Sequence, residues 1–378
     1  MTSYVKRPIG GLANLPEEMQ TDWEKLQSET IDWLRFPMAV AVVMIHHGVT
    51  LMPTATGPLQ SICILFEEGV CRLAVPFFFF SSGFLFFNRL QEWDCGIWTT
   101  KVKRRVHTLL LPYILWNIIA FFVFWIYTNI QGNPTSIYQF FHNSGGLRIF
   151  WGVNGGFPLG VRDVPFDSPL WFVRDLMYYT LAAPVLFYFI RQTKIYGLLL
   201  ICLAFYFVPG IIPEGFMFFI TGAWFQVNQK NMVELLFPIR KPLYLFSAVF
   251  LAATYAFHGE DYWGRLCKSI FMFVGIGTSF CSTAHLIMQE SIHIHPFLSH
   301  SSFFIYTSFE ILILHDIAQP LTGAILPNSG SFWPCLEFFL TPALAVGLCL
   351  GLFFLLERLL PRATAILTGG RMIKPSYS

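Results

Sequence analysis

Charged residues are scarce in this chain of 378 residues: they make up 12% of it, whereas a soluble globular domain carries roughly 25%. Hydrophobic residues account for 55% of the chain, and its mean hydropathy is +0.57. So few charges do not cover the water-exposed surface of a protein this size. The small net charge of +2 gives no reason to expect a nucleic-acid partner. We therefore predict a polytopic membrane protein.

Two further features are missing. None of the eight cysteines forms a C-x-x-C pair, and several fall inside apolar runs, which disfavours a disulfide framework or a structural zinc site. The histidines of "HIHPFLSH" (293–300) could suggest a metal, but no carboxylate or cysteine completes a ligand set, so we expect no metal site. The first thirty or so residues are polar, unlike a secretory signal peptide, so we expect no cleaved leader.

Ten apolar segments approach the length of about 20 residues that a membrane helix needs. They cover about 31–52, 60–87, 106–128, 171–190, 195–210, 213–228, 242–257, 268–288, 302–324 and 334–357. The predicted fold is an all-α membrane bundle over residues 31–358, with an outer loop at about 129–170. Residues 1–30 and 359–378 are predicted to be a cytoplasmic N-terminal segment and a cytoplasmic tail.

Lysine and arginine favour cytoplasmic loops and therefore test this topology. With ten helices and a cytoplasmic N-terminus, only four of the 24 basic residues fall in outer segments: Arg148, Arg162, Arg265 and Lys268. Arg72 and Arg174 lie within helices, and the rest are on the cytoplasmic side. This bias predicts a protein of the cell inner membrane with both termini in the cytoplasm.

The first apolar segment, "DWLRFPMAVAVVMIHH", keeps ionisable residues that are costly in a membrane and often functional there. Arg35 and His46 are eleven residues apart, which places them on one stripe of a helix, about 16 Å apart along its axis. Asp32 can pair with Arg35, and His47 points about 100° away from His46. The alternative is that His46 only holds the bundle together through a hydrogen bond.

Other polar side chains occur in three more of the predicted helices. Glu68 and Arg72 are spaced as an ion pair, Ser81 and Ser82 follow, Trp171 and Arg174 lie at a membrane edge, and Glu310 and His315 lie in the ninth segment. Each alone has a structural explanation, such as a local ion pair or an aromatic belt. Together they predict the lining of one polar cavity. The basic run "KVKRRVH" (101–107) is a topological anchor, with a second possible role in binding a phosphate.

Four segments resemble the acyltransferase 3 family of integral membrane O-acyltransferases, over residues 28–358. They are the R-x(10)-H helix with Arg35 and His46; "RLAVPFFFFSSGFLFF", which matches at Arg72, Val75, Pro76, Ser82, Gly83 and Phe84; "RVHTLLLPYILW", which matches at Pro112, Tyr113 and Trp116; and "PLWFVRDL". Two positions depart from the family pattern. Arg105 is followed by Thr108 where many members have a second arginine, and Tyr306 is followed by Phe309 where many have a histidine.

The resemblance implies transfer of an acyl group, usually acetyl, from acyl-CoA to a hydroxyl of a glycan or a lipid-linked sugar. We expect His46 to be the general base, or to form a transient acyl-imidazole. We expect Arg35, Lys103 and Arg105 to bind the acyl-CoA donor, and Asp32 to hold Arg35. Substrate-orienting roles are predicted for Arg72, Ser82, Trp171, Arg174 and Glu310. The alternatives are a secondary transporter or flippase for an anionic sugar or lipid, although no internal repeat supports it, and an inactive relative.

Overall fold

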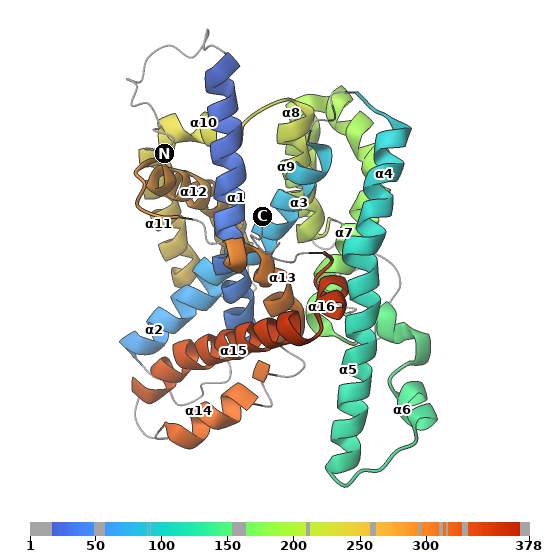
Figure 1. Cartoon of the computed structure of the whole chain (residues 1–378). Coiled ribbons are helices and arrows are strands. Elements are labelled where there is room, and N and C mark those ends of the chain that lie inside the picture. Colours follow the sequence, from blue (N-terminus) through green and yellow to red (C-terminus); the bar gives the residue numbers. More distant parts are fainter. Residues whose placement is uncertain are drawn as a thin grey trace.

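The computed structural model describes residues 17–48, 57–88, 90, 92–152, 164–208, 212–257, 262–293, 296–309, 313–314, 317–326 and 332–370. The described residues form helices, turns and loops, with no strand among them. The prediction of an all-α membrane bundle is confirmed (Figure 1).

The helices follow one another along the chain with these bounds: α1 (Glu17–His47), α2 (Pro58–Ile64), α3 (Ala74–Phe87), α4 (Cys95–Arg105), α5 (Leu111–Ile130), α6 (Ile137–Asn143), α7 (Trp171–Leu181), α8 (Ala183–Phe207), α9 (Glu214–Val227), α10 (Met232–Leu236), α11 (Arg240–Ala256), α12 (Tyr262–Met288), α13 (Pro296–Phe309), α14 (Gln319–Ile325), α15 (Phe332–Leu359) and α16 (Pro361–Leu367). Irregular helical turns at Leu65–Leu73 join α2 to α3, and a π-helical turn at Val106–Leu110 joins α4 to α5.

Six helical stretches in the described part are long and apolar enough to span a membrane. They are Pro58–Phe87, Cys95–Ile130, Ala183–Phe207, Met232–Ala256, Tyr262–Met288 and Phe332–Leu359. The other expected segments also contain helix, but α1 is more polar, and α7, α9 and α13 are shorter. The expected count of ten therefore stays a prediction, while the multi-pass architecture is established.

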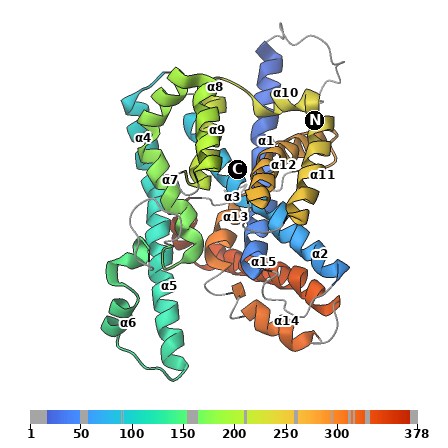
Figure 2. The ribbon, with the colours of Figure 1, turned by 180° about the vertical axis from the view of Figure 1, so that it is seen from behind.

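Helix α8 contains a break at the boundary expected between two of the predicted segments. Lys194 has φ 52° and ψ −130°, which no α-helical residue adopts. The stretch predicted at 171–190 thus corresponds to α7 and the first half of α8, and the stretch at 195–210 to its second half. Figure 2 shows α7, α8 and α9 from behind, on the side of the bundle that also holds α4 and α5.

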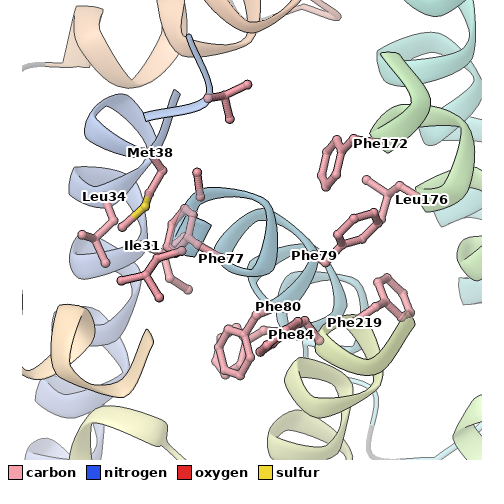
Figure 3. Packing of buried hydrophobic residues seen from close by; sticks show 14 of the residues in the cluster. Ile31, Leu34, Met38, Phe77, Phe79, Phe80, Phe84, Phe172, Leu176 and Phe219 are labelled. Atoms are coloured by element: carbon pink, nitrogen blue, oxygen red, sulfur yellow. The ribbon is translucent and has the colours of Figure 1, made fainter. Parts of the chain in front are cut away.

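Phenylalanines fill the centre of the bundle. Ile31, Leu34 and Met38 of α1 lie beside Phe77 of α3, while Phe79 of α3 packs on Phe172 of α7 with ring centroids 4.5 Å apart (Figure 3). Aromatic pairs in this edge-to-face arrangement add to the stabilisation from their buried area. Helix α3 is thereby held between α1 on one side and α7 and α9 on the other.

Two glycines let α3 and α9 approach closely. A Cβ atom on Gly83 of α3 would collide with the carbonyl oxygen of Phe219, and one on Gly222 of α9 would collide with that of Phe80. Small residues at such crossings allow membrane helices to pack backbone against backbone. This contact fixes α3, the helix that presents two serines to the cavity described next.

Candidate donor-binding site

A cavity of about 520 Å³ lies where α1, α3, α4, α7 and α13 meet the chain after α16. Four cationic residues line it, with hydroxyl groups and an apolar wall. The lining residues are Arg35, Lys101, Arg104 and Arg105; Ser81, Ser82, Thr108 and Ser302; Phe77, Phe78, Leu85, Phe86, Leu109, Phe172, Leu176 and Phe303; and Gly369 and Gly370. None of these described lining residues is an aspartate or a glutamate. The cavity is therefore suited to an anionic ligand with an apolar part.

Local structure places the basic side chains on the cavity face. Asp94 caps the N-terminus of α4, accepting hydrogen bonds from the amides of Gly96 (2.6 Å) and Ile97 (2.9 Å). From that start, positions 101, 104, 105 and 108 have the i, i+3, i+4, i+7 spacing of one helical face. Lys103 has no place in that series. It is exposed and does not line the cavity.

Each cation has a different immediate environment. Arg35 pairs with Asp32 at 2.6 Å, as the sequence predicted. The Nζ of Lys101 donates to the carbonyl oxygens of Phe86 and Asn88 at the C-terminal end of α3, where a positive charge is stabilised. The Arg105 guanidinium lies 5.8 Å from the centroid of the Phe86 ring. Among these contacts, only Arg35 is paired with a carboxylate. The cavity therefore keeps an excess of positive charge.

Ser81 stands out among the cavity hydroxyls. Its side chain is 5% exposed, and its Oγ has no hydrogen-bond partner among the described residues. Other helical hydroxyls in this protein donate to the carbonyl four residues earlier, as Ser279 does to Gly275 at 2.8 Å. A buried hydroxyl without a hydrogen-bond partner lowers the stability of the folded protein.

The two histidines at the end of α1 have different surroundings. His47 is 1% exposed and its ring lies 6.4 Å from that of Phe338 in α15. His46 is partly buried and lies on the Arg35 stripe, but it is not among the described residues that line the cavity. Residues 49–56, which follow α1, lie outside the described part. The stripe between Arg35 and His46 passes through Met38, Ala39 and Val42, which are buried.

Of the side chains expected in the polar cavity, Arg35, Ser82 and Arg105 are brought together. Arg72 is not. It pairs with Glu68 at 2.5 Å, as its spacing predicted, and the second oxygen of Glu68 accepts from Lys268 of α12 at 2.7 Å. Arg72 is thus part of an ion network away from the cavity.

Trp171 and Arg174 also lie outside the cavity lining. The Trp171 ring packs on Phe79 at 5.9 Å, and its neighbour Phe172 lines the cavity instead. Arg174 pairs with Asp175 at 2.9 Å and donates to the Trp151 carbonyl at 2.6 Å. Glu310 and His315 lie outside the described residues, as does the side chain of Phe309. Ser81, which the sequence also placed in the polar cavity, lines it beside Ser82. Lys101 and Arg104 belong to the basic run 101–107 but were not named as individual site residues, and the glycines at 369–370 were missed altogether.

Comparison with known proteins supplies the class of chemistry. A family model described as an acyltransferase domain, Acyl_transf_3, matches residues 29–358. The chain is 27% identical over 326 residues to the succinoglycan biosynthesis protein ExoH of Rhizobium meliloti (strain 1021), a match that covers 83% of this chain and 84% of that protein. No solved structure matches the chain. The match over nearly the whole membrane region shows that this protein belongs to the acyltransferase 3 family.

Proposed function

We propose that this protein transfers an acyl group, in the simplest case acetyl, from acyl-CoA to a hydroxyl of a polysaccharide or of its lipid-linked precursor. The observation that carries the proposal is the cavity, which gathers four cations and no described carboxylate on its wall. Coenzyme A carries several phosphate charges at one end and a flexible arm ending in the thioester at the other. Arginine is well suited to hold such phosphates through paired hydrogen bonds.

The position of the cavity fits a donor that arrives from the cytoplasm. Lys101, Arg104 and Arg105 belong to the basic segment that the distribution of charge assigns to the cytoplasmic side. Arg35 is on the same cavity and marks the start of the stripe that leads to His46, about 16 Å along α1. Phosphates held at the cationic end would leave the pantetheine arm to carry the thioester toward His46.

His46 is the proposed general base. Its imidazole would take the proton from the acceptor hydroxyl while that oxygen attacks the thioester carbonyl. The C–S bond then breaks, and the imidazolium returns the proton to the leaving thiolate, which balances the transfer. A covalent route through an acyl-imidazole is the variant of the same proposal in which the ring nitrogen attacks first.

The acceptor is proposed from the relative. ExoH is a succinoglycan biosynthesis protein, and succinoglycan is a polysaccharide, so a glycan hydroxyl is the corresponding acceptor here. The end of α1, which the predicted topology puts on the outer side, would then face the glycan. The proposed location is the cell inner membrane.

A transfer assay tests the proposal. Purified protein in lipid nanodiscs would be given acetyl-CoA labelled in the acetyl group together with candidate surface polysaccharides. We expect alkali-labile label on the polysaccharide and stoichiometric release of CoA thiol. Absence of both thiol release and ester formation, combined with sugar movement across vesicles without acetyl-CoA, would favour the transporter alternative.

A further inference from the structure

The end of the chain folds back onto the bundle. Helix α16 (Pro361–Leu367) contacts α5, where the indole Nε1 of Trp116 donates to the carbonyl of Leu367 at 3.1 Å (Figure 1). Thr364 and Thr368 are 1% and 0% exposed. This segment was expected to be a cytoplasmic tail, and it lies beyond the residues that the family model matches. Its burial shows that part of it belongs to the packed structure.

A tight turn ends α16. The amide of Gly370 donates to the carbonyl of Ala365 at 2.7 Å, and that of Gly369 donates to Ile366 at 3.1 Å. This pair of bonds is the Schellman arrangement, in which the residue after the helix has a left-handed backbone. Gly369 and Gly370 have φ values of +64° and +79°, which glycine adopts most readily.

The two glycines differ in what surrounds them. A Cβ atom on Gly369 would collide with the carbonyl oxygen of Thr108, whereas one on Gly370 would meet no atom within 4 Å. Both glycines line the cavity, together with Arg35 and Arg105. Thr108 also lines it and belongs to the π-helical turn between α4 and α5, a feature that often accompanies functional sites. The close approach at Gly369 therefore joins two parts of the cavity wall.

We propose that the Thr368–Gly370 turn is a wall of the donor site, and that Gly369 is a positioning residue for the phosphate end of acyl-CoA. The inference rests on the proposed function. A side chain at position 369 would push the turn away from Thr108 or into the cavity. Either displacement would separate the turn from the arginines across the cavity.

Matched glycine variants test this proposal. CoA itself would be the probe, with its Kd measured by calorimetry on purified Gly369→Ala and Gly369→Val proteins in nanodiscs. Gly132→Ala, after α5, has a similar backbone strain without a steric neighbour and does not line the cavity. Gly347→Ala in α15 has neither a positive φ nor a steric neighbour. We expect Gly369→Val to raise Kd by about tenfold or more, and both controls to stay within about threefold. Equal Kd values for Gly369→Val and Gly132→Ala would overturn the inference.

Chemical labelling gives a second measurement that does not depend on a tolerated valine. Gly370→Cys would be introduced with Cys95→Ser, because Cys95 is the exposed native cysteine among those described. We expect CoA to slow maleimide labelling of position 370, since the ligand would cover the turn. Undiminished labelling at a CoA concentration that saturates the same variant would reject the turn as part of the site. A wild-type protein that binds no CoA would instead reject the proposed function and this inference with it.

Discussion

Arg35 of α1 and Arg105 of α4 line the same cavity, although they are far apart in the sequence. Two like charges at one cavity repel each other unless something compensates for them. Asp32 pairs with Arg35, whereas no carboxylate among the described lining residues offsets the charge of Arg105. This excess of positive charge supports the proposal that the cavity binds the phosphates of a donor.

The two histidines at the end of α1 are expected to respond differently to substitution. His46→Ala should lower acyl transfer by about 10²–10⁴-fold, the usual cost of losing a general base. Correctly folded His47→Ala protein should keep most of the wild-type activity, because the His47 ring is buried against Phe338. Steady-state transfer rates on purified, correctly inserted proteins check this. An inactive but folded His47→Ala beside an active His46→Ala would reverse the assignment.

The Glu68 network should matter for stability. Glu68→Gln would leave Arg72 and Lys268 near each other without the carboxylate that now binds both. We expect a loss of about 1–3 kcal/mol in the free energy of unfolding, more than for an exposed pair. Glu29→Gln breaks the looser 3.9 Å pair with Lys25 and serves as the control, with little change expected. Equal apparent Tm values for Glu68→Gln and wild type would show that the network contributes nothing.

Removal of the Ser81 hydroxyl should not destabilise the ligand-free protein. The Oγ has no hydrogen-bond partner among the described residues. Ser81→Ala is therefore expected to leave the free energy of unfolding unchanged or to raise it by up to about 1 kcal/mol, and the apparent Tm should not fall. Ser279→Ala removes a hydroxyl that donates to Gly275 and is the matched comparison. A marked loss of stability in Ser81→Ala alone would mean that its hydroxyl has a structural partner.

Two native cysteines report on helix packing. The sulfur atoms of Cys63 and Cys335 lie 3.4 Å apart, between α2 and α15. A disulfide needs sulfurs about 2 Å apart, so a small movement suffices. Mild oxidation with copper phenanthroline should yield a cross-linked peptide pair containing these residues, detected by mass spectrometry. Cys281, which is buried in α12, should give no such product with Cys335. Absence of the Cys63–Cys335 product after complete oxidation would contradict the packing of α2 on α15.

Much of the bundle follows from hydropathy, because a long apolar run has few alternatives to a membrane helix. Helical periodicity also linked Arg35 with Asp32 and His46. The same helical periodicity places Arg104 and Lys101, one and four residues before Arg105, on the face of α4 that lines the cavity. Lys103, which we expected to bind the donor, falls outside that series.

Other parts of the structure depend on contacts that no local pattern contains. Nothing near Arg72 in the sequence indicates that Lys268 completes its ion network with Glu68. The return of Gly369 to Thr108 likewise requires the packing of α16 on α5. Such long-range contacts form only when the helices pack together. The sequence alone therefore could not test whether residues 359–378 form a tail or whether Arg72 orients the substrate.

Equilibrium binding of CoA to the purified protein tests the central claim most directly. We expect measurable binding that weakens as salt is raised, because phosphate contacts are screened. Arg105→Ala should weaken it by about tenfold to a hundredfold, the cost of one charged hydrogen-bonding group. Lys103→Ala, which removes a nearby exposed charge outside the cavity, should leave the Kd within about threefold of wild type. Binding that is equally weakened by both substitutions, or by neither, would contradict the assignment of this cavity to the donor.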